Sequence, residues 1–325
     1  MKLPTLLLLL PVLACTPKAA GTDTAEGEDT SSDDTSTADS AGTDVTPVWR
    51  EFRLGTSATL QGVYASGQGV YVVGTDGHAF VGSANDPWVP MDPPVGGVNL
   101  TDLWGQGADD ALVLQVPGAE GLISTYTSSG WAVEDLGTAN HEAIGGSGPG
   151  ALFAVGFGGV FYNGSGEWTF ETLPGNVRLN DIYAVGGSAI AVGEAGVILR
   201  RDETTGTWVA MESPTLSDLN AVAGSSPSDV WAVGADGVAL RFDGTVWSQV
   251  DTGVTLPLWA LFAPTSDAVF AVGNNGVALR WNGEIWESLP TGVANNLYAL
   301  HGVSAANVWA VGNRGTALQY KQTGG

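Results

Sequence analysis

The stretch VWAVGADGVALRFDGTVW, residues 230–247, carries the pattern that decides the fold. An apolar run ends in a glycine and is followed by Asp236-Gly237, a second apolar run, Asp243-Gly244 and then Trp247. Short runs rich in β-branched and aromatic residues predict strands, and Asp-Gly pairs supply the positive φ angles that tight hairpins require. The stretch therefore predicts two strands joined by a hairpin, and a second hairpin leading to a further strand that begins at Trp247.

The same phrase returns along the chain, which indicates a repeat. Its copies are Val70–Gly74, Phe153–Gly156, Ile190–Gly193, Val230–Gly234, Val269–Gly273 and Val308–Gly312, with a weaker one at Ala111–Gln115. Their last residues, 74, 115, 156, 193, 234, 273 and 312, lie 37 to 41 residues apart, which is typical of a four-stranded propeller blade. Another apolar strand precedes each copy: Leu60–Ala65, Leu100–Gly105, His141–Gly145, Leu179–Ala184, Leu219–Ala223, Leu258–Ala263 and Leu297–Gly302. We therefore expect an all-β protein, a seven-bladed β-propeller of four-stranded blades over residues 48–325.

The last repeat lacks its fourth strand. In the other copies this strand begins at a tryptophan, but no tryptophan follows Tyr320 in the last copy. The missing strand is available at the other end, since Trp49–Phe52 precedes Val70 by the interval that separates Trp247 from Val269, to within one residue. We expect this N-terminal strand to complete the last blade, which removes the free sheet edges of an open array.

The N-terminus predicts export and lipid attachment. Lys2, the apolar run Leu6–Leu10 and Ala14 directly before Cys15 resemble a lipoprotein signal peptide, here residues 1–14. The resemblance implies a lipid on Cys15, and Thr16 after it favours the bacterial outer membrane or cell surface. Residues 16–47 contain eight acids, one Lys and no aromatic residue, so residues 15–47 are expected to form a disordered acidic tether.

The charge balance argues against some partners. Residues 48–325 hold 26 acids and nine Lys or Arg, a net charge of −17. Nucleic acids and anionic lipid head groups are bound through clustered Lys and Arg, so we expect no nucleic-acid partner and no membrane contact except through the lipid anchor. Solubility explains the acidity, with cation binding as the alternative.

The sequence resembles a known group of proteins at its second hairpin. The motifs Asp243–Trp247 and Asn282–Trp286 resemble the Asp-box of sialidase-type propellers. Over residues 48–320 the chain resembles the repeat-bearing, BNR-like surface lipoproteins of predatory and social bacteria and, more distantly, the photosystem assembly-factor propellers. The resemblance implies a scaffold and no particular activity.

The sequence contains no complete motif for catalysis. A sialidase requires an arginine cluster and a Tyr/Glu pair, whereas Arg200, Arg241 and Arg280 recur as repeat residues. The three histidines fall in different repeats, and Cys15 is the one cysteine, so no metal site and no cofactor are predicted. We expect a non-enzymatic, monomeric propeller that binds an envelope protein or a glycan, with an extracellular glycosidase-like propeller as the alternative.

Candidate ligand contacts lie on the turns between second and third strands. These turns and the links between blades should share one face, where propellers commonly bind their ligands. The candidates on this rim are Asp76, Glu120, Glu194, Asp236, Asn274, Asn275, Asn313 and Arg314. Alternatively, they are turn formers with solvated side chains. Three tryptophans follow the repeat pattern less closely than the others and are further candidates for ligand contact: Trp104, Trp259 and Trp281.

Overall fold

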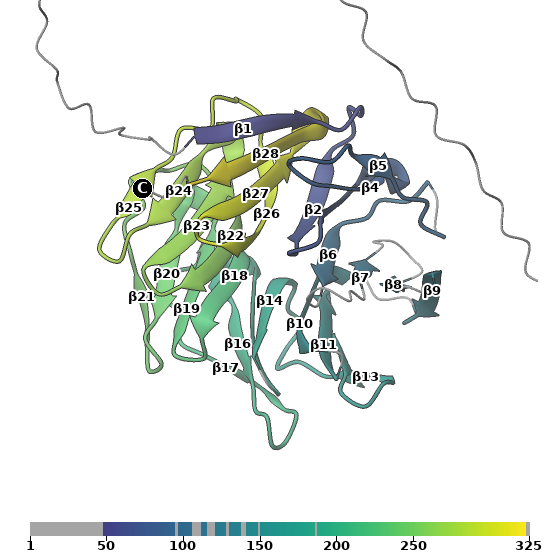
Figure 1. The fold of residues 1–325 in the computed structure, drawn as a ribbon. Coiled ribbons are helices and arrows are strands. Elements are labelled where there is room, and N and C mark those ends of the chain that lie inside the picture. The colour runs from purple at the N-terminus through teal and green to yellow at the C-terminus, as the bar shows by residue number, and fades with distance from the viewer. Residues whose placement is uncertain are drawn as a thin grey trace, which may run out of the picture. The chain divides into compact units, whose positions relative to one another are not determined.

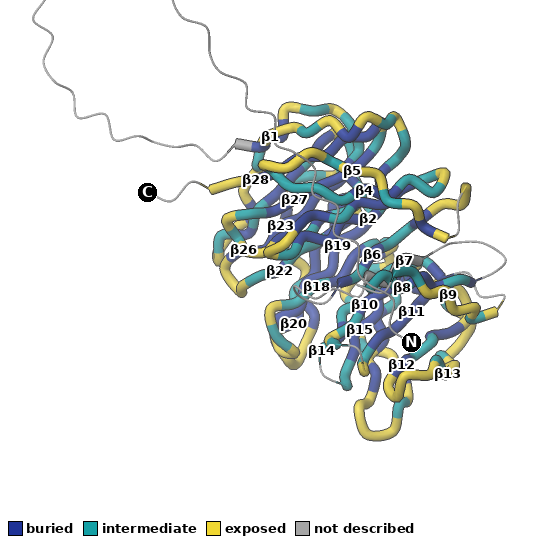
Figure 2. Tube along the Cα trace, turned by 45° about the vertical axis from the view of Figure 1, so that its right-hand side comes forward, coloured by how far each residue is buried: buried dark blue, intermediate teal, exposed yellow. Residues whose placement is uncertain are grey.

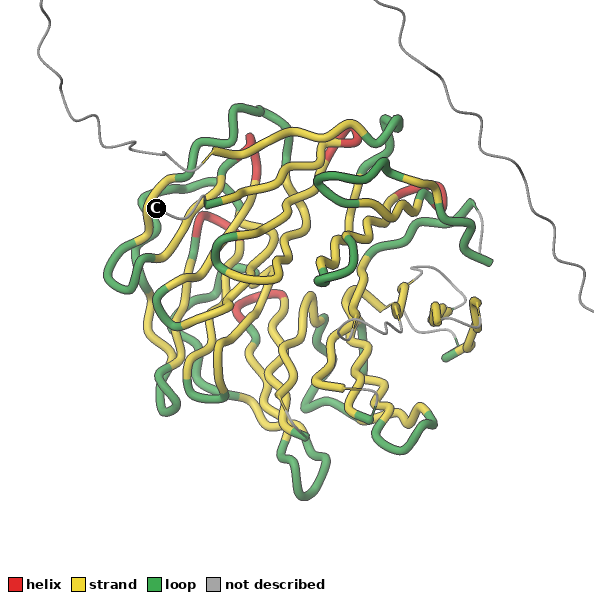
Figure 3. The backbone as a smooth tube through the Cα atoms, in the orientation of Figure 1, coloured by secondary structure: helices red, strands yellow, loops and turns green. Residues whose placement is uncertain are grey.

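Strands pair in sequence to form four-stranded antiparallel sheets. The computed structural model describes residues 48–322, apart from 95–96, 106–111, 116–120, 128–129, 138–140, 149 and 186. Within these residues the strands form seven such sheets. Figure 1 shows them fanned about a common centre, and helix is confined to short turns (Figure 3). The residues predicted to form the signal peptide and the tether, Cys15 among them, lie outside the described residues, as does Glu120.

The first four sheets run in chain order from the inner to the outer strand. They are β2 (Leu60–Ala65), β3 (Val70–Gly74), β4 (Ala79–Gly82) and β5 (Val89–Pro90); β6 (Asp102–Gly105), β7 (Leu112–Gln115), β8 (Leu122–Thr127) and β9 (Gly130–Asp135); β10 (His141–Gly148), β11 (Ala151–Gly156), β12 (Val160–Asn163) and β13 (Trp168–Glu171); and β14 (Leu179–Val185), β15 (Ser188–Gly193), β16 (Ile198–Arg201) and β17 (Trp208–Ala210).

The remaining three sheets follow the same order except at the end of the chain. They are β18 (Leu219–Ser226), β19 (Asp229–Gly234), β20 (Ala239–Phe242) and β21 (Trp247–Gln249); β22 (Leu258–Thr265), β23 (Ala268–Gly273), β24 (Ala278–Trp281) and β25 (Trp286–Ser288); and β26 (Leu297–Ser304), β27 (Asn307–Gly312), β28 (Thr316–Lys321) and β1 (Val48–Arg53).

The inner strands β2, β6, β10, β14, β18, β22 and β26 make a closed ring. Each contacts the inner strand of the next sheet, and β26 contacts β2. The chain is thus an all-β propeller with four-stranded blades.

The N-terminal strand occupies the place that the sequence predicts. β1 pairs antiparallel with β28, and Trp49 lies opposite Tyr320 in the register. Figure 1 shows β1, in purple, beside the yellow β28. The prediction that the first strand completes the last blade is confirmed.

Short turns on one face join the second strands to the third. Five of them are 3₁₀ segments: η1 (Thr75–Gly77), η2 (Glu194–Gly196), η3 (Ala235–Gly237), η4 (Asn274–Gly276) and η5 (Asn313–Gly315). In each, the middle residue has φ between 53° and 57° and the following glycine has φ between 69° and 73°, as in a type I′ turn. The predicted role of Asp236-Gly237 is confirmed, and Asp76-Gly77 and Asn275-Gly276 adopt the same conformation.

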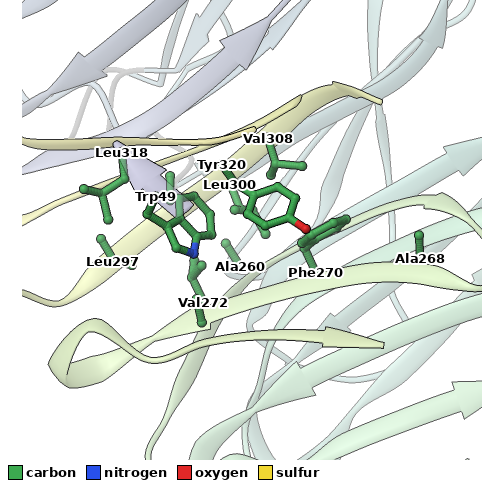
Figure 4. Close-up of a cluster of buried hydrophobic side chains, with 12 residues drawn as sticks. Trp49, Ala260, Ala268, Phe270, Val272, Leu297, Leu300, Val308, Leu318 and Tyr320 are labelled. Carbon is green, nitrogen blue, oxygen red and sulfur yellow. The ribbon is translucent and has the colours of Figure 1, made fainter. Parts of the chain in front are cut away.

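The hydrophobic core lies between adjacent sheets. Buried residues follow the strands, whereas the outer turns are exposed (Figure 2). In Figure 4, Trp49 and Tyr320 of the last sheet pack beside Phe270 of the preceding one. Trp231 and Trp309 are also among the fully buried residues, as expected for packing residues of the repeat.

Candidate functional site

A central channel runs between the inner strands of the sheets. Its cavity of about 280 Å³ is lined by residues from all the inner strands, including Gln61, Glu142, Asn220, Trp259 and Tyr298. A concave site on the axis of a propeller can be reached by several strands at once. We therefore take the channel as the candidate site.

One recurring irregularity shapes the mouth of the channel. In the described register, six of the inner strands carry a β-bulge between their first and third residues, for example between Leu60 and Gly62. A bulge leaves one residue out of the ladder and redirects its side chain. The extra residues are Gln61, Glu142, Asn180, Asn220, Trp259 and Tyr298, and Thr101 holds the corresponding place before β6. All seven residues line the cavity, and none of them is buried. We call them the mouth ring.

Two aromatic members of the mouth ring form a pair. Trp259 of β22 and Tyr298 of β26 lie with ring centroids 6.0 Å apart in an edge-on arrangement, and Trp259 is 36% exposed. The indole Nε1 of Trp259 donates a hydrogen bond of 2.7 Å to Asn274 Oδ1, and Asn296 Nδ2 donates to the Tyr298 hydroxyl at 3.2 Å. These bonds orient both rings while part of their surface stays open to solvent.

Amide members of the mouth ring tie one sheet to the next. Asn180 Nδ2 donates to the carbonyl oxygen of Leu219 at 2.9 Å, and Asn220 Nδ2 donates to that of Leu258 at 2.8 Å. Their amide nitrogens are therefore engaged in the ring itself.

Two aspartates that line the channel, Asp102 and Asp181, each directly follow a residue of the mouth ring in the sequence. Asp102 accepts hydrogen bonds from the backbone N–H groups of Leu103, at 2.7 Å, and of Ile144 in the next sheet, at 2.8 Å. Asp181 accepts from Ile182 and from Val222 in the next sheet, both at 2.7 Å. Each carboxylate thus bridges neighbouring sheets.

The environment of these carboxylates favours the protonated form. Burial raises the pKa of Asp102 to about 6, although its two backbone donors act in the opposite direction. Burial raises the pKa of Asp181 to about 8, and the negative charge of Asp102 contributes to this increase. Near neutral pH the channel therefore holds about one negative charge on this pair.

A histidine also reaches the channel wall. His301 of β26 uses Nδ1 to accept a hydrogen bond of 3.1 Å from the backbone N–H of Ala65 on β2. Burial lowers the pKa of His301 to about 4, so the imidazole is neutral at physiological pH. It packs against Tyr64 and Phe262, with ring centroids 4.8 and 5.3 Å away.

The rim residues from the sequence lie on the face of the channel mouth but outside the channel lining. The backbone N–H at the start of each described turn bonds to the carbonyl that precedes an inner strand, as between Ala235 and Asp218, so these turns and the mouth ring share one face. Asp76 and Arg314 instead line two neighbouring surface hollows, of about 350 and 500 Å³, and Arg178 Nε lies 3.7 Å from Glu194 Oε1. The remaining rim positions are Asp236, Asn274, Asn275 and Asn313, none of which lines the cavity.

The three tryptophan candidates have different surroundings. Trp259 lies at the channel mouth. Trp281 is buried against Trp231 and Trp286, so it is a packing residue and its choice as a ligand contact was wrong. Trp104 is half-buried, and its Nε1 donates to the carbonyl of Gly146 in the next sheet, at 3.1 Å.

Most of the mouth ring was missed by the sequence analysis. Gln61, Asn180, Asn220 and Tyr298 are unremarkable singly, because the bulge that turns them inward leaves no mark in composition. The repeat does hold the signal, since each follows the leucine that opens an inner strand.

Comparison with known proteins identifies the fold. No known protein family and no curated protein matches the sequence. Among solved structures, the chain is similar to YCF48 bound to a D1 peptide, with a TM-score of 0.70 and 16% identity over 86% of this chain and 96% of that one. The chain is a β-propeller.

Two other similar structures show how widely the fold is shared. The WD40 propeller domain of Doa1 has a TM-score of 0.71 and 11% identity, over 84% of this chain and 96% of that one. A catalytically inactive virginiamycin B lyase from Staphylococcus aureus, with quinupristin, has a TM-score of 0.76 and 13% identity, over 86% of this chain and all of that one. At such identities the likeness shows the fold alone, and it agrees at that level with the propeller resemblance drawn from the repeats.

Proposed function

We propose that the chain is a non-enzymatic binding module, a seven-bladed propeller whose channel mouth holds an extended segment of another envelope protein. The mouth ring carries this proposal, because it gathers solvent-accessible polar and aromatic side chains from every inner strand around one cavity. Aromatic residues with a polar group, such as Trp259 and Tyr298, are frequent anchors of protein interfaces. YCF48, which has the same fold, was solved with a peptide, and this supports a protein partner.

The test is capture of partners from native membranes by the full chain. Replacing Trp259 and Tyr298 by asparagine should abolish capture, and the fold should tolerate both changes because Asn180 and Asn220 occupy the same place in other repeats. Ile285→Asn is the matched control, since Ile285 is 60% exposed on a turn at the opposite ends of the strands. Capture that survives the double substitution would remove the channel mouth from the function.

A second arm separates the rim from the channel. Replacing Asp76, Glu194 and Asp236 by alanine tests whether the turns contribute to binding. Loss of capture in this triple variant, with full capture by the Trp259/Tyr298 variant, would move the site outward to the rim.

A glycan is the alternative occupant, and carbohydrate cleavage is the alternative function. The exposed Trp259 favours a sugar to some degree, because sugars stack on aromatic rings, and one similar fold belongs to a lyase. A glycan array together with hydrolysis assays decides between the two. Turnover of a polysaccharide would replace the binding proposal.

We further propose that a lipid on Cys15 anchors this module at the outer membrane or cell surface. Among the described residues, no helix has the length and apolar character to span a bilayer. Metabolic labelling with a radioactive fatty acid should mark the protein, and Cys15→Ser should abolish the label and release the protein from membranes. Labelling that persists in Cys15→Ser would contradict the anchor.

A further inference from the structure

We propose that the channel takes one lysine or arginine side chain of the bound segment, which passes between Trp259 and Tyr298 towards Asp102 and Asp181. This inference rests on the proposed function and names the chemistry of its partner. It follows from the charges of the lining, from its hydrogen-bonding groups and from the arrangement of the inner strands.

The lining offers negative charge without a competing internal cation. Its carboxylates are Asp102, Glu142 and Asp181, and the residues that line the described cavity include no lysine or arginine. Arg178, which does not line the cavity, forms an ion pair with Glu142, with 2.5 Å between Nη2 and Oε1. An anionic ligand would face the carboxylates of Asp102 and Asp181 unscreened, whereas a cation is attracted to them.

The hydrogen-bonding groups of the lining also call for a donor. Gln61 Oε1 is a buried acceptor without a hydrogen-bond partner, and the buried Thr101 hydroxyl, which can accept as well as donate, also has none. Asn180 and Asn220 each donate one amide N–H to a backbone carbonyl, and Trp259 donates its Nε1–H to Asn274. Ammonium and guanidinium groups are pure donors, so they complement a cavity in which acceptors are in excess.

The order of the inner strands sets the aromatic pair opposite the aspartates. Asp102 is on β6 and Asp181 on β14, so they flank β10 on one wall of the ring. Trp259 and Tyr298 are on β22 and β26, which face β10 across the channel. A cation that lies over a ring face on one side and near the carboxylates on the other combines cation–π attraction with ion pairing.

The size of the cavity limits what can enter. About 280 Å³ accommodates a single long side chain but no folded element. The flexible, unbranched stems of lysine and arginine carry the charge away from the backbone of the segment, which can remain at the mouth.

Binding of such a cation should be linked to proton release. The other charged or titratable groups that line the cavity with the two aspartates are Glu142, paired with Arg178, the neutral His301, and Tyr298. An arriving cation favours the ionised aspartates, so Asp181 loses its proton on binding. Affinity should therefore rise between pH 6 and pH 8.5, a range in which lysine and arginine stay charged.

The experiment uses the full chain and the peptide GSGYKYGSG, acetylated and amidated at its ends, beside versions with norleucine or Nε-acetyllysine at the central position. Calorimetry at low salt should show at least tenfold tighter binding of the lysine peptide. Proton release on binding should make the observed binding enthalpy vary with the ionisation enthalpy of the buffer. Asp102→Ala combined with Asp181→Ala should reduce the difference to less than twofold. This variant should fold, because Ala143, Ala221, Ala260 and Ala299 hold the same position in other repeats.

A matched control removes the same charge elsewhere. Glu167→Gln with Glu284→Gln removes two negative charges from two exposed turns at the opposite ends of the strands and should leave the tenfold preference unchanged. Equal binding of the lysine and norleucine peptides, absence of binding by either, or an equal loss in the control variant would overturn the inference. Capture of partners that needs Trp259 and Tyr298 but survives Asp102→Ala/Asp181→Ala would reject the cationic side chain and leave the proposed function standing.

Discussion

Trp49 and Tyr320 lie opposite each other on strands β1 and β28, with ring centroids 5.5 Å apart, although they come from the two ends of the propeller sequence. Both are buried, and Tyr320 also contacts Phe270 of the preceding sheet, at 5.4 Å (Figure 4). The two ends of the repeat are therefore held together by a packed aromatic cluster as well as by the β1–β28 ladder. The contact between Trp49 and Tyr320, which closes the ring of sheets, is therefore also part of the hydrophobic core.

Trp49→Ala should be strongly destabilising for this reason. The indole is 7% exposed, and truncation of a buried tryptophan to alanine costs about 3–5 kcal/mol of unfolding free energy. Urea denaturation at pH 7 measures the loss. Trp259→Ala is the control, since Trp259 is 36% exposed and its truncation should cost about 1 kcal/mol or less. Equal losses in the two variants would mean that β1 does not hold the ring closed.

His141→Leu should stabilise the protein. His141 stands where the other repeats have a buried leucine, and its Nε2 is buried without a hydrogen-bond partner. An unsatisfied buried polar group costs about 1–3 kcal/mol, which leucine would recover.

The gain from His141→Leu should also depend on pH. Burial lowers the pKa of His141 in the folded protein to about 4, below its unfolded value of 6.5. The contribution of the neutral His141 to stability is therefore fully present above pH 6.5 and is lost as the pH falls towards 4, whereas the leucine variant lacks this loss. The difference in unfolding free energy should widen from pH 7.5 to pH 4.5. His301 titrates equally in both proteins and cancels, so parallel curves would show that His141 is hydrated.

The repeat phrase and the turn pairs were sufficient to predict the propeller and the pairing of β1 with β28. Periodicity and hairpin chemistry act locally, so residues such as Asp236 and Gly237 reveal their conformation in the sequence itself. The offset of the tryptophan strand added one long-range contact, that of Trp49 with the end of the chain.

The site was harder to predict because it depends on how side chains turn away from regular strands. Asn220 and Tyr298 reach the channel through a bulge, and Asp102 and Asp181 gain their raised pKa from neighbouring sheets. Rim residues such as Asp236 were chosen by their place on turns, but they lie outside the lining of the channel. Local pattern thus predicts which strand carries a residue, and packing decides what that residue faces.

Asp102→Ala combined with Asp181→Ala should change the pH dependence of stability. Both carboxyl groups have folded pKa values, about 6 and about 8, above the unfolded value of 3.8. Their contribution is fully present below pH 3.8 and is lost as the pH rises towards 8, because the unfolded chain ionises more readily. The stability of the natural protein relative to the variant should therefore fall between pH 4 and pH 8.5. A difference that stays constant over this range would show that folding does not raise the pKa of either aspartate.

Glu171→Ala should cost far more than Arg178→Ala, although each breaks an ion pair between neighbouring sheets. Glu171 and Arg201 have side chains only 13% and 7% exposed, and Glu171 Oε2 also accepts a hydrogen bond of 2.9 Å from Trp208 Nε1. Loss of Glu171 leaves a buried guanidinium and an indole N–H without their acceptor, which costs about 3–5 kcal/mol. Arg178, at 44% side-chain exposure, pairs with Glu142 in water, where such pairs contribute about 1 kcal/mol or less. Urea denaturation of both variants at 0.05 and 0.5 M NaCl measures the contrast, and salt should reduce only the smaller effect. If the two variants lost similar amounts of unfolding free energy, Arg201 would be in contact with solvent. Its ion pair with Glu171 would then lie outside the core of the ring.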